Sequence, residues 1–192
     1  ILLKNLGVKK IWVSRYNCDA ILEPISALGI DYGTYDLESN LLPKSIKLKE
    51  GEVILYVDYY GLNRINCLEV LKKFGKENVI LDLSQAFFNK YASSIYSFYS
   101  PRKFFGLPDG GLVYPNSKET LAQNKTAKSL SHLFYRLEGD MEKAYQAYLD
   151  NEKSLSFTSA KAMSLISQKI LRGQNMEEIK RIRNINFKLY HD

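Results

Sequence analysis

This chain of 192 residues is long enough to bury a core as one domain, and its shares of hydrophobic (45%) and charged (25%) residues are those of an ordinary globular protein. Its net charge of +6 comes from basic residues scattered singly or in pairs among acids, which argues against a nucleic-acid-binding surface and favours a mild preference for anionic ligands such as phosphates. The two cysteines and two histidines are too few and too far apart for a disulfide framework or a zinc site, so we expect no metal. No apolar run reaches the length of a membrane span and no signal peptide is visible, so we expect a cytoplasmic protein without a membrane partner.

The first residues resemble the end of a helix rather than the start of a protein. Leu2, Leu3 and Leu6 would form its apolar stripe, and Gly7 would end it. Because natural chains seldom begin in this way, we expect the sequence to be a piece of a longer protein.

Short apolar runs alternate with helical patterns through the first half of the chain. Residues 11–13 predict a buried strand, residues 20–28 a helix that Asp19 caps and Gly29 ends, and residues 30–36 a second strand. Beyond a predicted loop, the same alternation gives strands over residues 53–57, 79–81, 94–98 and 111–114, and a helix over residues 67–74. This alternation indicates an α/β fold, namely a three-layer, mostly parallel, doubly wound sheet.

The pattern changes after Pro115, where no further strand is predicted. Helical spacing then covers residues 121–137, 141–152, 159–171 and 176–190, the last helix being capped by Asn175. We therefore divide the chain into an α/β core over residues 1–115 and a helical segment over residues 116–192.

The stretch that carries the chemistry runs from Asp82 to Gly111. Asp82 ends an apolar strand, Gln85 follows three residues later, and Lys103 lies in a serine-rich turn seven residues before Gly110. Because ligands of open α/β sheets bind outside the carboxyl ends of the strands, we expect these side chains at one crevice. A carboxylate and a lysine together suit pyridoxal phosphate: the carboxylate keeps the pyridinium nitrogen protonated, and the lysine forms a Schiff base.

The order Asp-x-x-Gln-Ala, Ser-Phe, Lys and Gly-Gly over residues 82–111 resembles the DegT/StrS family of pyridoxal-phosphate aminotransferases, and a weaker likeness extends back to about Ile11. The resemblance implies a fold type I enzyme that passes an amino group from a donor such as glutamate to a keto acceptor, in the first place a nucleotide-linked keto-sugar. It also implies a homodimer, because such enzymes build their sites between two subunits. The family's phosphate-binding helix N-terminus would precede Ile1, and its small C-terminal domain would follow Asp192.

The resemblance assigns a role to each residue of the motif, and each also has a plain structural interpretation. Lys103 would bind the cofactor covalently and then shuttle the reaction's proton, whereas a lysine without this motif would be a surface residue. Asp82 would pair with the pyridinium nitrogen, but a carboxylate at this point also suits the cap of a following turn. Gln85 would reach the cofactor's phenolic oxygen, or else be a surface glutamine.

The remaining cofactor contacts are less sharply predicted. Ser97 and Ser100 compete for the cofactor's phosphate, because the family's serine lies five residues before the lysine and these lie six and three residues before it; either serine could instead bond its own turn. Cys18 occupies the place of an aromatic residue that stacks on the cofactor ring in many family members; either Tyr16 compensates for it, or the stacking platform is lost. The segment Asp58-Tyr59-Tyr60-Gly61 matches a family stretch that usually reads His-x-Tyr-Gly and lines the crevice, with Asp58 in place of the histidine; Asp58 could instead be only a strand-end residue.

Two other functions stay open at this point. The absent phosphate-binding segment, the absent small domain and the cysteine at position 18 favour a non-catalytic aminotransferase-like protein that acts as a binding or assembly partner. An unrelated nucleotide-binding α/β domain, such as a sugar-transferring enzyme, ranks last, because no glycine-rich loop follows the first strand.

Overall fold

The structure, a computed structural model, describes residues 1–116, 120–124, 130–155 and 159–191. Its centre is a sheet whose strands follow the order β2-β1-β3-β4-β5-β6. Neighbouring strands pair in parallel except for β5 and β6, which are antiparallel. The strands are β1 (Lys10–Ser14), β2 (Asp31–Tyr35), β3 (Glu52–Val57), β4 (Val79–Asp82), β5 (Ser97–Tyr99) and β6 (Leu112–Tyr114). The predicted α/β class and the mostly parallel sheet are therefore confirmed.

One face of the sheet is covered by helix α3 (Arg64–Phe74). Tyr56 of β3 and Leu81 of β4 are fully buried on this face, where they pack in one apolar cluster with Cys67 and Val70 of the helix. Each successive side chain of a strand points to the opposite face, so a continuously apolar strand requires cover on both sides.

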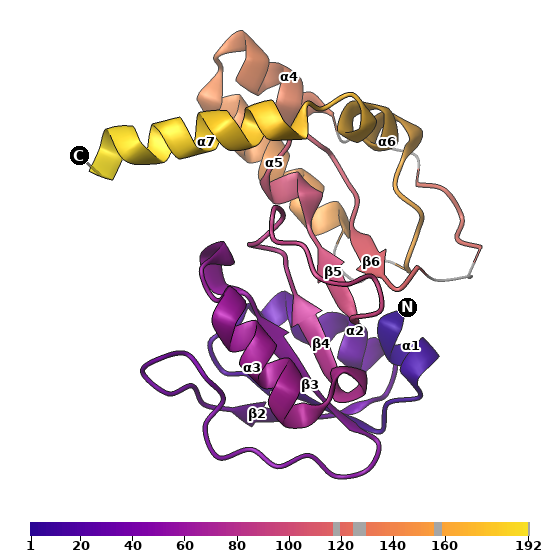
Figure 1. Ribbon diagram of the computed structural model, residues 1–192. Coiled ribbons are helices and arrows are strands. Elements are labelled where there is room, and N and C mark those ends of the chain that lie inside the picture. The colour runs from indigo at the N-terminus through magenta and orange to yellow at the C-terminus, as the bar shows by residue number, and fades with distance from the viewer. Residues whose placement is uncertain (117–119, 125–129, 156–158, 192) are drawn as a thin grey trace.

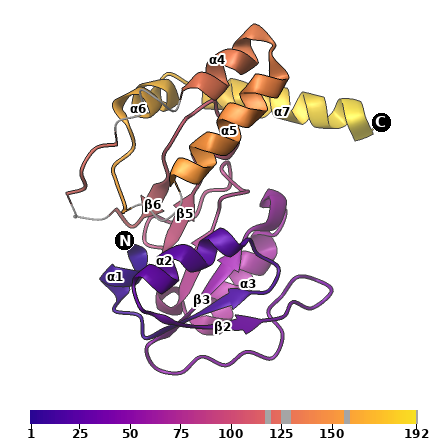
Figure 2. The same cartoon turned by 180° about the vertical axis from the view of Figure 1, so that it is seen from behind.

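The opposite face is covered by the short helices α1 (Leu2–Leu6) and α2 (Leu22–Ala27). Leu2 and Ile25 of these helices join Leu55 of β3 in a second apolar cluster. Figures 1 and 2 show α3 on one side of the sheet and α1 and α2 on the other. The two central strands, β3 and β4, are thus buried from both sides, which explains their uninterrupted apolar sequences.

The predicted helix stop at Gly7 is confirmed, but the predicted cap at Asp19 is wrong. Gly7 ends α1 in the left-handed conformation, with a φ of 58°. Asp19 instead lies inside a 3-10 turn, η1 (Asp19–Ile21), which Cys18 precedes without a side-chain cap, and α2 begins only at Leu22.

The helices of the second half are α4 (Ser131–Glu138), α5 (Met141–Leu155), α6 (Leu165–Arg172) and α7 (Met176–His191). The helical prediction for residues 121–137 is wrong at its start, because Gln123 and Ala162 pair as an isolated β-bridge and residues 121–124 are not helical. Residues 125–129 lie outside the described part of the chain. Short extended pairings of this kind leave no periodic signal in a sequence.

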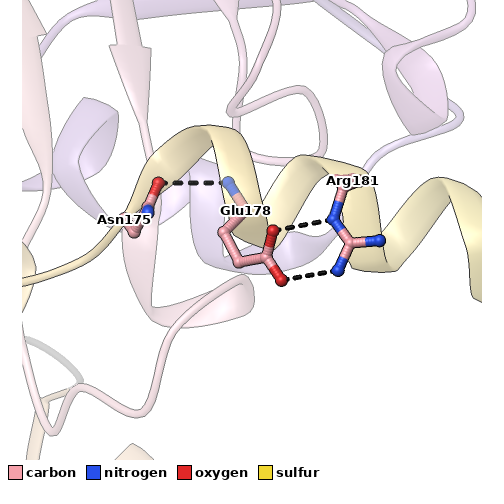
Figure 3. Close-up of polar contacts among 3 residues, drawn as sticks. All are labelled: Asn175, Glu178 and Arg181. Atoms are coloured by element: carbon pink, nitrogen blue, oxygen red, sulfur yellow. Dashed lines mark hydrogen bonds and ion pairs between the residues drawn. The ribbon is translucent and has the colours of Figure 1, made fainter.

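Capping side chains set the starts of the last two helices. The Oγ of Ser164 accepts a hydrogen bond from the backbone N–H of Ser167, so α6 begins later than the helix predicted over residues 159–171. The predicted cap at Asn175 is confirmed, because its Oδ1 accepts from the N–H of Glu178 at 3.1 Å (Figure 3). Such caps satisfy backbone donors that the first turn leaves free.

The four helices of the second half lie together beyond one end of the sheet, next to β5 and β6 (Figures 1 and 2). Within the described residues β6 is the last strand, and the division of the chain into two domains at residue 115 stays a prediction. None of the helices in the described ranges is long and apolar enough to cross a membrane.

Candidate active site

Five of the seven predicted site residues line a single cavity of about 400 Å³. They are Tyr16, Cys18, Asp82, Gln85 and Lys103. The first two follow β1 and the next two lie at or after the end of β4, and parallel strands place their carboxyl ends along one edge of a sheet. The topology therefore brings together residues that lie up to 87 positions apart in sequence.

Asp82 is the last residue of β4 and is 7% exposed. Its Oδ1 accepts a hydrogen bond from the backbone N–H of Ser84 at 2.8 Å, so it does bond the turn that follows, although no helix begins there. Burial raises the pKa of this carboxyl, while hydrogen bonds from Ser84 and the charge of Lys103 oppose the shift. A buried carboxylate of this kind gains from a cationic partner placed in the cavity.

Lys103 ends a 3-10 turn, η4 (Pro101–Lys103), that follows β5. Its side chain is exposed and lines the Asp82 cavity from the side opposite β1. The flanking residues hold the turn in place: Pro101 and Phe105 are buried, and Arg102 pairs with Glu152 of α5. The lysine therefore presents an exposed amine from a turn that buried neighbours hold in place.

Gln85 is oriented by the loop that follows β3. Its Oε1 accepts a hydrogen bond from the backbone N–H of Tyr60 at 3.1 Å. Tyr60 holds a left-handed conformation, with a φ of 57°, which is uncommon for a residue other than glycine. Since Oε1 is engaged, the amide NH₂ of Gln85 is the group left to donate to a ligand.

Tyr16 and Cys18 form the wall that follows β1. The ring of Tyr16 packs on that of Tyr59 with centroids 5.3 Å apart, and the Tyr59 hydroxyl donates to the Tyr16 carbonyl at 2.8 Å. Tyr16 is 58% exposed, so its ring is available to a ligand, and Cys18 is exposed beside it. The aromatic surface at this wall comes from the tyrosines, while Cys18 adds only a small apolar group.

The two predicted phosphate serines do not line this cavity. Ser97 is buried, its Oγ donates to the Ile95 carbonyl at 3.3 Å, and it borders a different cavity. Strand alternation explains this placement, because it is Phe98, the next residue, that faces the Asp82 cavity. Ser100 borders a third cavity, which also contains Lys103.

Asp58 is also held away from the Asp82 cavity. It is fully buried, and its carboxylate accepts hydrogen bonds from the N–H of Asn63, the amide of Asn89 and the hydroxyl of Tyr91. These bonds tie the end of β3 to two later loops. In the sequence both aspartates directly follow an apolar run, so sequence alone does not separate the two; in the structure it is Val57, not Asp58, that pairs with Asp82.

Sequence reasoning placed Tyr59 at the crevice only as part of a segment matched by resemblance, and it missed Ser84 and Phe98, which also line the cavity. Tyr59 and Ser84 each follow a strand end within two residues, and that position was a usable signal. Phe98 had none, since its orientation depends on the pairing of β5 with β4.

The donor set around the cavity fits the ring of pyridoxal phosphate better than its phosphate. A buried carboxylate, an amine and an amide donor surround the space, and a tyrosine ring lies along it. Lys103 is, however, the one cationic side chain that the described residues place in this lining, and the serine hydroxyl there is that of Ser84.

No family model matches the sequence, and no curated protein matches it. Among solved structures, the chain is similar to a crystal structure of a protein from Burkholderia pseudomallei that is provisionally assigned as an aminotransferase, with 15% sequence identity and a TM-score of 0.45. The similarity covers 77% of this chain, and the chain spans about half, 52%, of that structure's length. At this identity and TM-score the likeness establishes neither a shared fold nor a shared activity.

Proposed function

We propose that this chain is the cofactor-binding core of a pyridoxal-phosphate-dependent aminotransferase of fold type I, similar to the DegT/StrS enzymes. The observation that carries the proposal is the convergence of Asp82, Gln85 and Lys103 on one cavity, in the order and spacing of that family's motif. Pyridoxal phosphate, when bound, supplies an electron sink for the amino-transfer chemistry.

Each residue has a task that its surroundings support. Asp82, whose pKa is raised by burial in spite of the charge of Lys103, would hold a proton on a ring nitrogen by pairing with its positive charge. Lys103 would anchor the cofactor through its exposed amine and carry a proton to and from the substrate's α-carbon. Gln85 would donate its amide NH₂ to a ring oxygen, and Tyr16 would pack along the ring.

The substrates and assembly follow from the resemblance and belong to the proposal. The amino donor would be an amino acid such as glutamate, and the acceptor a keto compound, in the first place a nucleotide-linked keto-sugar. A homodimer in the cytoplasm would complete the site, with the phosphate contacts supplied by segments other than Ser97.

The test is a reduction experiment on the chain mixed with pyridoxal phosphate. Borohydride should fix the cofactor on one lysine, and peptide mapping should find it on Lys103. Lys103→Ala should abolish both the visible absorbance before reduction and the adduct after it, whereas Lys90→Ala should leave both unchanged. Lys90 is a control at an exposed lysine of the same stretch, outside the Asp82 cavity. An adduct spread over several lysines, or one that survives Lys103→Ala, would refute the assignment.

A second candidate is a non-catalytic protein of the same architecture that acts as a binding or assembly partner. The observation that favours it is the Asp82 cavity's shortage of phosphate-binding groups among the described residues. Transamination assayed with glutamate separates the two: turnover that depends on Lys103 excludes the non-catalytic protein, and cofactor binding without turnover favours it.

A further inference from the structure

A second cavity, of about 380 Å³, lies on the other side of the turn that carries Lys103. Helices α4, α5 and α7 contribute to its lining, and so do the aromatic residues Phe104 and Phe105. Its polar lining consists of Ser100, Arg102, Lys103, His132, Arg136, Tyr148, Glu152 and Arg183. Four cationic side chains thus face one carboxylate in a single cavity.

Arg102 is the most buried of these cations, with 22% of its side chain exposed. It pairs with Glu152 of α5, and its Nε is buried without a hydrogen-bond partner among the described residues. A buried N–H donor of this kind calls for an acceptor. Glu152 is the one carboxylate that the described residues place in this lining, so the cations of the lining outnumber it.

Arg183 reaches the cavity from α7 and is fixed against the turn of Lys103. Its guanidinium lies 5.0 Å from the centroid of the Phe104 ring, and Nη2 donates to the Phe104 carbonyl at 3.2 Å. Arg136, in the last turn of α4, supplies a further exposed guanidinium. Arginines from three separate elements, η4, α4 and α7, therefore line this one cavity.

Arg181, on the same helix as Arg183, differs from it by pairing with a carboxylate of its own helix. Arg181 donates from Nε and Nη2 to the two carboxylate oxygens of Glu178, each at 2.7 Å (Figure 3). Residues two apart on a helix do not share a face, so Arg181 and Arg183 point in different directions. The helix thus carries one arginine that is neutralised by its own helix and one that lines the cavity.

We infer that this cavity binds a phosphate group. The phosphate belongs to a small molecule other than the cofactor, and the opposite end of that small molecule reaches Lys103. Planar guanidinium groups bind phosphate oxygens in pairs, and several such groups favour a dianion over a singly charged carboxylate. Lys103 lines both cavities, so it stands between the bound phosphate and Asp82. The phosphate site stands on its own, whereas the reach to Lys103 rests on the proposed function.

The first experiment is calorimetric titration of the cofactor-free chain with inorganic phosphate. We expect saturable one-to-one binding that Arg136→Gln and Arg183→Gln each weaken about tenfold, because each removes a charged donor. Arg183→Lys keeps the charge but loses the paired donors, so it should recover only part of the affinity, and the matched control Arg181→Gln should bind as the unchanged chain does. Thermal melting of each variant separates lost binding from lost folding.

A second experiment locates the phosphate relative to the cofactor. After pyridoxal phosphate has been fixed on Lys103 by borohydride, the phosphate titration is repeated. Retained binding supports a separate ligand, and loss of binding overturns that part of the inference, because the cofactor's own phosphate would then fill the cavity. Absent phosphate binding, or binding that the folded Arg136→Gln and Arg183→Gln variants leave unchanged, overturns the site itself, whatever the result at Lys103.

Discussion

Asp82 and Asp109 are buried carboxylates at opposite ends of one stretch of chain, and their surroundings are opposite. Asp82, at the sheet edge, is hydrogen-bonded within the described residues by Ser84 alone, and burial raises its pKa. Asp109, at the junction with the helices, accepts from the N–H and Oγ of Ser164, the Oγ of Ser167 and the amide of Asn124. Burial opposes its ionisation, but these hydrogen bonds outweigh burial and lower its pKa.

The contrast between the two aspartates separates a group suited to binding, Asp82, from a structural group, Asp109. A carboxylate whose acceptor sites are filled by the protein has little left to offer a ligand, and Asp109 instead fastens the segment that follows Lys103 to the start of α6. A carboxylate that is buried yet poorly bonded and lines a cavity is typical of a functional group. The helical half thus holds the lysine turn in position, and the sheet edge supplies the group that faces the lysine.

The largest change in stability should come from weakening the hydrogen bonds of Asp109 to the start of α6. Asp109→Asn replaces a charged acceptor with a neutral amide, and we expect a loss of about 1.5–3 kcal/mol in the free energy of unfolding, measured in urea. Asp150→Asn, on the exposed side of α5, is the matched control and should change stability by less than about 0.5 kcal/mol. Equal effects at the two positions would mean that the bonded network contributes nothing.

The same variant predicts a change in pH dependence. Because the folded pKa of Asp109 lies below its unfolded value, its contribution is present above the unfolded pKa of about 3.9 and is lost as pH falls through the folded value. Asp109→Asn should therefore flatten the acid limb of the stability curve. An acid limb identical to that of the unchanged chain would contradict the lowered pKa.

Asp82→Asn should raise the free energy of unfolding, by a smaller amount than Asp109→Asn lowers it. Asparagine keeps an acceptor for the N–H of Ser84 and removes a charge that burial disfavours, so we expect a gain of about 0.5–1 kcal/mol at pH 7. Because the folded pKa of Asp82 is raised, the unchanged chain should lose stability as pH rises from the unfolded pKa through the folded value, and the variant should not. Cofactor retention should fall at the same time; a variant that is destabilised and retains the cofactor would reverse the functional interpretation of Asp82.

The sequence predicted the sheet side of this comparison better than the helical side. Uninterrupted apolar runs such as Val79 to Leu81 predict buried strands directly, and a carboxylate at the strand's end follows from the topology. The role of Asp109 could not be predicted, because its partners Ser164 and Ser167 lie more than 50 residues away, with separations of 55 and 58. The cavity lined by Arg102, Arg136 and Arg183, here called the arginine cavity, depends in the same way on how α4, α5 and α7 pack together. No local pattern in the sequence encodes that packing.

Ser97 and Ser100 offer the smallest and sharpest test, since the sequence did not separate them and the structure places them at different cavities. Ser97→Ala removes a long hydrogen bond to the Ile95 carbonyl, so it should cost about 0.5–1 kcal/mol and leave both the Lys103 adduct and phosphate binding unchanged. Ser100→Ala should weaken binding of inorganic phosphate a few-fold with little change in stability, because its hydroxyl borders the arginine cavity. Both variants need only a urea titration, the borohydride adduct and the phosphate titration. If Ser97→Ala instead abolished the Lys103 adduct, Ser97 would be the residue that binds the cofactor's phosphate. Strand β5 would then have to lie in another register when the cofactor is bound.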